Sequence, residues 1–356
     1  MTFVRIDQNA WEAGLARLAA VYRLFGPVKE GSVHEFKALD AGQRPDMNYL
    51  NTRRSPKALI YPQSEKMFDF SLDETQADHN ILREAEKDYT PRAVIGIRPC
   101  DADAFLLVRK NFDTPEYRDP YWVKAYEATT LVGLACSAPC STCFCTTAGS
   151  GPFHEAGLDL LLVEEDGTYL AKVLTPKGAA LVEAAGWGEA ADAAAAEGRL
   201  QELRAAAEER IVSRVPTAKL KDQEINPLFD APFWQEVAFS CINCGTCTSV
   251  CPTGWCFDIQ DEVHGKKGIR YRNWDSCMYP LFTYHGSGHN PRSQKTQRVR
   301  QRFMHKLKYF VDKYDDGIQC VGCGRCIRLC PVNIDIRRVC NLMNNFDATA
   351  CAIPAA

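Results

Sequence analysis

The 356-residue sequence lacks the features of a membrane-spanning or exported protein. Every apolar run is shorter than the ~18–20 residues that a membrane span requires. The start at Met1 has no long apolar core of the kind found in secretory signals. We therefore expect a cytoplasmic protein without a membrane span.

The sequence also has little net charge and no common nucleotide-binding motif. A formal net charge of −3 gives no overall attraction to nucleic acid or to an anionic membrane, so we expect no nucleic-acid partner. No glycine-rich strand–turn–helix fingerprint and no P-loop is present. The sequence thus predicts no NAD(P), ATP or flavin site of the usual kind in this chain.

Cysteine, in contrast, is abundant, with 17 residues. In a small secreted domain such a number would predict disulfides, but this chain is large and concentrates its thiols in Cys-x-x-Cys runs. Metal ligation is the better interpretation. The length and a hydrophobic content of 46% allow two or three folded domains around it.

Two complete ferredoxin motifs lie in the C-terminal third, each with the spacing Cys-x2-Cys-x2-Cys-x3-Cys-Pro. In two-cluster ferredoxins the fourth cysteine of each motif binds the cluster of the other motif. The predicted ligands of the first [4Fe-4S] cluster are Cys241, Cys244, Cys247 and Cys330, and those of the second are Cys320, Cys323, Cys326 and Cys251. Zinc is the weaker alternative, because structural zinc sites use paired cysteines separated by a longer span.

Further cysteines follow two apolar runs in the N-terminal half. Residues 93–97 and 130–135 read as strands with a helix from Asp101 to about Asn111 between them, and Asp101 is the expected cap of that helix. If the strands are parallel, their carboxyl ends share one edge of a sheet, and Cys100 and Cys136 converge there.

This N-terminal group also contains Cys140, Cys143 and Cys145, so that five thiols are available where a cluster needs four. We expect a third [4Fe-4S] cluster and favour Cys140 as the spare thiol. Three alternatives remain: buried free thiols, a zinc site, and a reactive thiol at Cys100 activated by a helix N-terminus and Arg98.

The predicted fold class is α+β with several domains. Residues 1–177 form a mixed α/β domain with the third cluster, in which residues 56–62 are a short strand and residues 158–174 a hairpin. Residues 178–232 are an Ala-rich helical spacer and linker. Residues 233–356 are an α-helical two-cluster ferredoxin domain, whose insertion between the motifs looks helical, especially over 293–313.

Several of these residues together resemble a known family, the beta subunit of sulfhydrogenase-type cytoplasmic [NiFe] hydrogenases and the corresponding iron–sulfur subunit of anaerobic sulfite reductase. The marks of the resemblance are Ser55-Pro56-Lys57, Pro62-Gln63-Ser64-Glu65, Gly96-Ile97-Arg98-Pro99-Cys100-Asp101, Cys143-Phe144-Cys145, Gly149-Ser150-Gly151-Pro152 and Trp274-x2-Cys277. Family members commonly have glycine at the position of Cys140. The resemblance therefore implies Cys100, Cys136, Cys143 and Cys145 as ligands of the third cluster.

The resemblance further implies that the chain relays electrons between two partner subunits. One partner binds flavin and NAD(P), and the other is a catalytic oxidoreductase subunit of hydrogenase, sulfite reductase or heterodisulfide reductase type. Two hypotheses of other classes compete with this relay. One is a self-sufficient reductase that acts on a small sulfur substrate at the N-terminal cysteines, and the other is an iron–sulfur redox sensor.

Three remaining features carry less chemistry. A basic stretch from Arg292 to Lys308 is expected to be a solvated helical face, with docking to an acidic partner or to flavin phosphates as the functional reading. We assign no role to His285 and His289. The cysteines outside both groups are expected to be packing or incidental thiols: Cys256, Cys277, Cys340 and Cys351.

Overall fold

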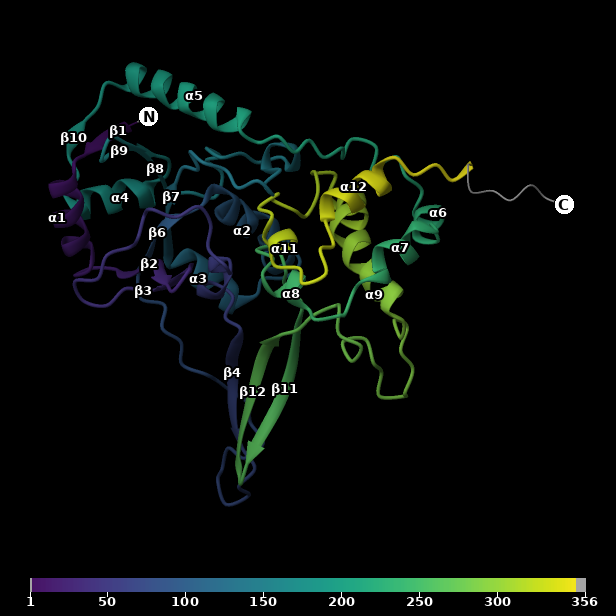
Figure 1. The fold of residues 1–356 in the computed structure, drawn as a ribbon. Helices are drawn as coiled ribbons and strands as arrows, with labels where there is room; N and C mark the ends of the chain where they lie inside the picture. Colours follow the sequence, from purple (N-terminus) through teal and green to yellow (C-terminus); the bar gives the residue numbers. More distant parts are fainter. Residues whose placement is uncertain (1, 350–356) are drawn as a thin grey trace.

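The computed structural model of the protein describes residues 2–349, and a mixed eight-stranded sheet forms its N-terminal part (Figure 1). The strand order is β10-β1-β9-β8-β7-β6-β2-β3. The central pairs β2–β6, β6–β7 and β7–β8 are parallel, and the outer pairs are antiparallel. The strands are β1 (Thr2–Ile6), β2 (Arg23–Glu30), β3 (Val33–Ala38), β6 (Arg92–Ile97), β7 (Thr129–Leu134), β8 (Leu160–Glu165), β9 (Thr168–Val173) and β10 (Glu189–Ala190).

Helices cover both faces of this sheet. The helices are α1 (Gln8–Leu18) and α4 (Pro176–Ala185) on one face, and α2 (Pro99–Phe112), α3 (Pro120–Glu127) and α5 (Ala193–Glu209) on the other. Strand β8 serves both layers, because Leu160 and Leu162 pack with α1 and α4 while Leu161 and Val163 pack on the opposite face. Each fully buried leucine contributes about 1.5–3 kcal/mol to folding.

The strands and helices expected around Cys100 and Cys136 are confirmed. Strands β6 and β7 are parallel neighbours, α2 follows β6, and β8 and β9 form the expected hairpin. The cap of α2 differs from the prediction, since Arg98 occupies the N-cap position and Asp101 lies inside the first turn. The carboxylate of Asp101 bonds Arg325 instead, as described below.

The segment from Pro56 to Pro62 is not the strand that its apolar residues predict. It contains the 3-10 turn η1 (Pro56–Leu59). Pro56 fixes the backbone at the first position of the turn, and the hydroxyl of Ser55 accepts the N–H of Lys57. This local capping outweighs the apolar pattern.

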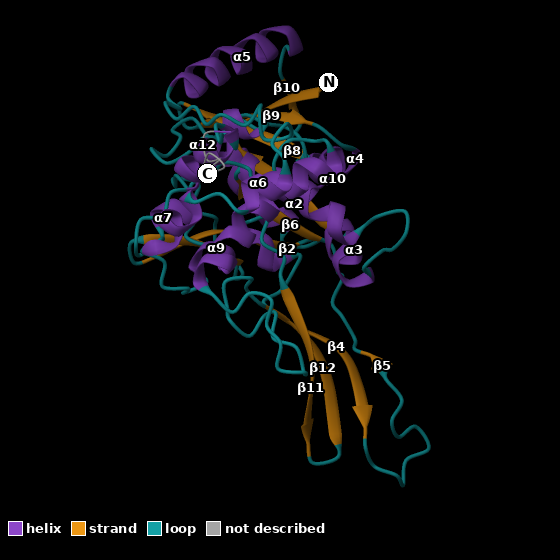
Figure 2. Cartoon of the chain, turned by 90° about the vertical axis from the view of Figure 1, so that its right-hand side faces the viewer, coloured by secondary structure: helices purple, strands orange, loops and turns teal. Residues whose placement is uncertain are grey.

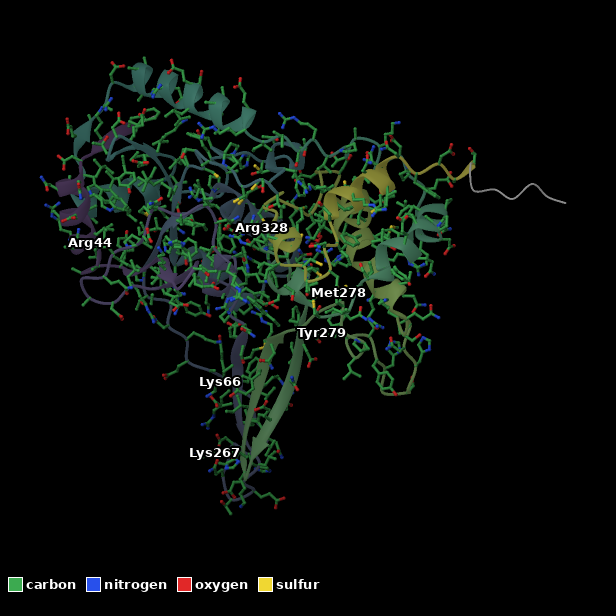
Figure 3. The ribbon with its side chains drawn as sticks, viewed as in Figure 1. Arg44, Lys66, Lys267, Met278, Tyr279 and Arg328 are labelled. Carbon is green, nitrogen blue, oxygen red and sulfur yellow. The ribbon has the colours of Figure 1, made fainter. Side chains whose placement is uncertain are left out.

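A second sheet forms an arm that projects from the body (Figures 1 and 2). Its strands, in spatial order, are β11 (Phe257–His264), β12 (Lys267–Trp274), β4 (Ser64–Ser71) and β5 (Arg83–Glu84). Strand β12 pairs with β4 from the other half of the chain, with Lys267 opposite Ser71 and Asn273 opposite Ser64. Side chains extend on both sides of the arm, where Lys66 and Lys267 are labelled in Figure 3.

The C-terminal part is mainly helical around its own apolar core, which includes Trp234, Phe303 and Leu307. Its helices are α6 (Ile225–Phe229), α7 (Phe233–Phe239), α8 (Thr246–Ser249), α9 (Lys295–Phe303), α10 (Phe310–Tyr314), α11 (Arg325–Arg328) and α12 (Ile336–Asn344), with a π-helical segment η3 (Met304–Tyr309). The helix expected over 293–313 is thus found. The helical prediction for the whole insertion is wrong in its first half, which forms the β11–β12 hairpin. The α+β class is confirmed.

The Ala-rich segment after residue 177 has two functions in the fold. Helix α4 belongs to the sheet domain, because Leu181 and Ala185 pack in the same core as Trp11 and Leu15 of α1. Helix α5 then runs over the opposite face and leads to the C-terminal part. In the part of the chain that is described, no helix is both long and apolar enough to cross a membrane.

Candidate metal centres

The first thiol group lies between α7, α8 and the end of the second ferredoxin motif. Cys241, Cys244 and Cys247 line one cavity together with Cys330 from the second motif, which follows α11. Apolar side chains such as Met278 complete the walls. Cys326 of the second motif and Arg302 also line this cavity. The four predicted ligands thus surround one space, and four thiolates fit the donor set of a [4Fe-4S] cluster.

Local turns aim backbone amides at these sulfurs. The N–H of Asn243 donates to the Cys241 sulfur at 3.4 Å, and the N–H of Ile334 donates to the Cys330 sulfur at 3.3 Å. Gly245 has φ 72° at the start of α8, a left-handed conformation that glycine adopts without strain. Amides directed at sulfur stabilise the thiolate form and raise the reduction potential of a cluster bound there.

The second thiol group is formed by Cys320, Cys323 and Cys326 with Cys251 of the first motif. Burial raises the pKa of each of the first three, and the charge of nearby Cys251 raises it further. Burial also opposes ionisation of Cys251. Lys306, the hydroxyl of Thr253 at 3.3 Å and Lys57 outweigh it, and lower the pKa of Cys251 to about 6. A thiolate is the form that binds metal.

The five cysteines of the N-terminal thiol group line one cavity. Cys323 of the second thiol group also forms part of its wall. The five are Cys100, Cys136, Cys140, Cys143 and Cys145. Parallel strands β6 and β7 bring the first two together, as expected. A hydrogen bond between the thiols of Cys140 and Cys143 lowers the pKa of Cys140 and raises that of Cys143. The described structure thus brings the predicted spare thiol to the same cavity as the other four.

Arg98 fixes the loops around this cavity. Its guanidinium donates to the carbonyl of Ala135 at 2.8 Å and to those of Leu50 and Tyr49. The side chain is buried, with 6% of its surface exposed, and its charge lowers the pKa of Cys136 against the larger effect of burial. Arg98 therefore connects the ends of both strands to the preceding loop, and its charge favours the thiolate form at Cys136.

The N-terminal and second thiol groups share a wall. The N–H of Phe144 donates to the carbonyl of Gly322 at 2.9 Å, and the thiol of Cys143 lies 3.9 Å from the carbonyl oxygen of Cys323. A side chain at Gly322 is excluded, because a Cβ there would lie 2.5 Å from the nitrogen of Cys145. This close backbone approach brings two thiol groups that are about 180 residues apart into direct contact.

A buried ion pair holds the same junction. Both terminal nitrogens of Arg325 donate to the carboxylate of Asp101 at 2.6 Å, and the guanidinium also donates to the carbonyl and the hydroxyl of Thr52 at 3.0 Å. Both members of the pair are almost completely buried. Since Asp101 follows Cys100 and Arg325 precedes Cys326, the pair joins the two motifs directly.

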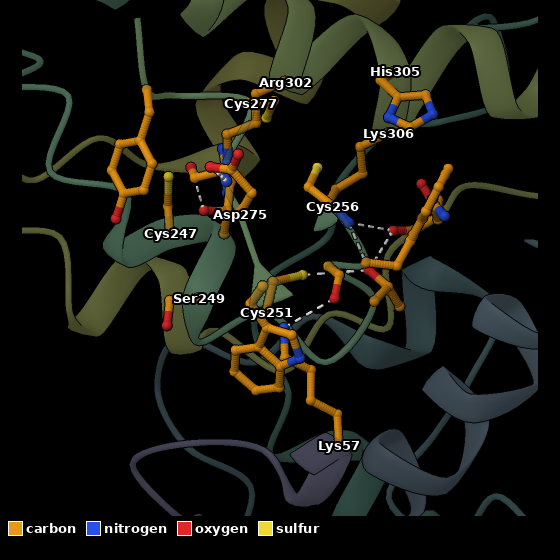
Figure 4. A pocket seen from close by; sticks show the side chains of 18 of the residues that line it. Lys57, Cys247, Ser249, Cys251, Cys256, Asp275, Cys277, Arg302, His305 and Lys306 are labelled. Atoms are coloured by element: carbon orange, nitrogen blue, oxygen red, sulfur yellow. Dashed lines mark hydrogen bonds between the residues drawn. The ribbon is translucent and has the colours of Figure 1, made fainter. Parts of the chain in front are cut away.

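A further cavity lies beside the first and second thiol groups, and we call it the lysine-lined cavity (Figure 4). Cys247 and Cys251 reach it from the first motif. Lys57 donates to the carbonyl of Gly254 at 2.9 Å, and burial lowers the pKa of Lys57 to about 8. Lys306 donates to Thr253 and to the carbonyl of Gln319, both at 2.6 Å. Two buried cations thus lie close to Cys251.

The basic stretch is therefore not the solvated face that its charge predicts. Arg298, Arg302, Lys306 and Lys308 are all less than 8% exposed. Arg298 donates to the carbonyls of Arg292 and Ser293, and Lys308 donates to the carbonyl of Lys221 and to Asp312. Arg302 and Lys306 lie against the thiol groups instead, since both line the lysine-lined cavity and Arg302 also lines the cavity of the first thiol group. Sequence reasoning missed these residues and Lys57 as parts of the site. The signal in the sequence that could have identified them is a run of basic residues, without acidic ones, between two cysteine motifs.

The remaining cysteines divide into two kinds. Cys340 is buried in the C-terminal core and its thiol lies 3.3 Å from the carbonyl of Pro216, which confirms a packing role. Cys256 and Cys277 line the lysine-lined cavity. Cys351 lies outside the described residues. Within residues 2–349, no group of three or more His, Cys, Asp or Glu side chains is placed to hold a metal ion.

Comparison with known proteins gives one match to the C-terminal part and one to nearly the whole chain. Residues 240–334 match the 4Fe-4S dicluster domain. Sulfhydrogenase 2 subunit beta of Pyrococcus furiosus is 28% identical over 348 residues, which cover 94% of this chain and 96% of that protein. No solved structure matches the chain. The resemblance to sulfhydrogenase-type beta subunits is thereby confirmed over nearly the whole length.

Proposed function

We propose, from this similarity and from the three adjoining thiol groups, that the chain is an iron–sulfur electron-transfer subunit. It relays electrons between a flavin- and NAD(P)-binding partner and a catalytic subunit of hydrogenase, sulfite reductase or heterodisulfide reductase type. The complex belongs in the cytoplasm, where thiols remain reduced and available as cluster ligands. This proposal makes the chain a conductor rather than the place of the terminal reaction.

The observation that carries the proposal is the continuity of the three thiol groups. Cys251 joins the first motif to the second group, and Cys323 forms part of the N-terminal cavity. [4Fe-4S] clusters bound in these groups would each accept and release one electron. Electrons would then pass along one line through both halves of the chain.

The ligand assignment follows the same geometry. We assign Cys241, Cys244, Cys247 and Cys330 to the first cluster, and Cys320, Cys323, Cys326 and Cys251 to the second. For the third cluster, in residues 1–177, we assign Cys100, Cys136, Cys143 and Cys145. Support for crossed ligation comes from Cys330, which lines the cavity of the first motif.

The chain's own residues set the energy of each step. Amides at the Cys241 and Cys330 sulfurs and the cations Lys57, Arg302 and Lys306 favour the more negative, reduced state of a nearby cluster. The first thiol group lies closest to the surface, since Cys244 is exposed. We therefore assign one docking position for a partner subunit to the surface around Cys244.

Metal content tests the ligand assignment. The anaerobically prepared chain should contain about twelve iron atoms and twelve sulfides, four of each per cluster. Cys145→Ser should reduce both to about eight, whereas the matched variant Cys140→Ser should keep about twelve. A wild-type content of eight, or the loss of four irons in Cys140→Ser alone, would contradict the assignment of the third cluster.

Activity of the isolated chain tests the relay. With an artificial electron donor and no partner subunit, we expect no turnover of sulfite, polysulfide or a disulfide. Turnover that Cys140→Ser abolishes would favour the self-sufficient reductase, because the Cys140 thiol shares the cavity of the N-terminal group. Reduction of the chain by its flavin partner, followed by reoxidation by the catalytic subunit, is the result expected for a relay.

A further inference from the structure

Two cysteines that the proposed clusters do not use lie together at the base of the arm. Strands β11 and β12 pair with Phe257 opposite Trp274, and the N–H of Asp275 donates to the carbonyl of Cys256 at 2.9 Å. This register brings Cys277 back to Cys256 although 20 residues separate them in the sequence. The hairpin thus fixes the two thiols side by side.

Both thiols line the lysine-lined cavity, and so do Cys247 of the first thiol group and Cys251 of the second. Figure 4 shows Cys256 between Cys277 and Cys251. Arg302 and Lys57 extend into the same cavity, and Lys57 also lies 4.0 Å from the ring of Trp274. The pair therefore adjoins ligands of two different proposed clusters.

The two sulfurs have unequal surroundings. A hydrogen bond between the thiols and a second one from the backbone N–H of Cys277 lower the pKa of Cys256. The same thiol contact raises the pKa of Cys277. The two thiols therefore contact each other at the base of the hairpin, as the formation of an S–S bond between them requires.

We propose that Cys256 and Cys277 form a reversible dithiol–disulfide pair that exchanges electrons with the first and second proposed clusters. Oxidation removes two protons and two electrons from the thiols and forms one S–S bond. The protons would leave to solvent, and clusters held by the first and second thiol groups would accept the two electrons, one electron each. Reduction reverses every step.

The pair gives the chain a two-electron store beside one-electron carriers. Formation of the bond requires the sulfurs to approach to about 2.05 Å. The inference rests on the proposed function, because the clusters are the electron acceptors. Disulfide mapping nevertheless tests it separately from metal content.

The experiment is a redox titration of the full chain with its clusters, kept anaerobic. Samples poised at a series of potentials are quenched in acid, alkylated with iodoacetamide and digested for mass spectrometry. We expect alkylated Cys256 and Cys277 at low potential and a linked peptide at high potential. Their ratio should change tenfold for about 30 mV, as for a two-electron couple. Alkylation of both thiols at every potential that leaves the iron bound would overturn the proposal.

Variants distinguish this pair from cluster ligands. Cys256→Ser and Cys277→Ser should each abolish the linked peptide and keep the wild-type iron content. Cys340→Ser, which alters a buried thiol of the C-terminal core, should keep both the peptide and the iron. Loss of four irons in Cys256→Ser or Cys277→Ser would make that residue a ligand and refute the pair, while the relay itself would stand. A wild-type chain without iron would instead contradict the proposed function.

Discussion

Replacing Asp101 with alanine would leave the guanidinium of Arg325 without its counter-charge in a place where 0% of its side chain is exposed. Removing one partner of a buried ion pair typically costs about 3–5 kcal/mol, because the remaining charge stays desolvated. The cost should appear where the two halves of the chain meet, since Asp101 belongs to α2 and Arg325 begins α11.

The double variant Asp101→Leu with Arg325→Met removes both charges and keeps apolar volume. Such replacements are often neutral, or stabilising by about 1–4 kcal/mol. Here the carbonyl and hydroxyl of Thr52 also lose their donors, which costs about 1–3 kcal/mol. We therefore expect the free energy of unfolding of the double variant to be close to that of the wild type and well above that of Asp101→Ala.

Anaerobic hydrogen–deuterium exchange measures the effect locally. A loss of 3–5 kcal/mol corresponds to roughly two to three and a half orders of magnitude in the protection of amides in α2 and in residues 320–330. As a control, Glu236→Ala breaks an exposed ion pair with Arg338, and should change protection less than about tenfold. Unchanged protection in Asp101→Ala, or an equal loss in the double variant, would refute the reasoning.

Three further predictions concern the neighbouring sites. Gly322→Ala should remove about four irons from the chain, because Gly322 has a φ of +64° and a Cβ there would meet the backbone of Cys145. The control Gly317→Ala should retain the iron, because Gly317 has a similar φ of +62° but open space around it. Lys306→Met should lower the midpoint potential of the second cluster in an EPR-monitored titration, because the Lys306 charge favours negative charge at Cys251 and so favours the more negative, reduced state of a cluster bound there. Burial, Lys306 and other cations lower the pKa of His305 to about 4. The unfolded chain takes up a proton at His305 as the pH falls below the ordinary pKa of about 6.5, whereas the folded chain takes it up only near pH 4. The free energy of unfolding of the wild type, relative to that of His305→Gln, should therefore fall by up to about 3 kcal/mol across that range. The difference in melting temperature between the two proteins measures this change.

The sequence was informative wherever the determinant of structure was local. The strand–helix–strand unit around Cys100 could be predicted because an unbroken apolar run, a proline at the helix start and a second run lie close together in the sequence. The ferredoxin motifs could be recognised for the same reason, since their spacing alone expresses how a chain wraps around a cluster.

The role of Asp101 could not be predicted in this way. A carboxylate in the first helical turn is an ordinary capping signal, and only the position of Arg325, 224 residues later, makes it an ion-pair partner. The prediction of a solvated face for the basic stretch was wrong for a similar reason, because charge and helical periodicity do not reveal which residues pack against the helix. Thiolates at Cys247 and Cys251 convert Arg302 and Lys306 from surface residues into buried ones.

The arm has a consequence for how the protein is made. Strand β4 leaves the ribosome about 200 residues, or roughly 10–40 s, before its partner β12. During this interval a strand that carries Phe68 and Phe70 has no long partner in its sheet, and such an edge can pair with another nascent copy. Slow translation would lengthen this exposure. We therefore expect chaperones that protect β4 until Trp274 has emerged to raise the yield of folded chain.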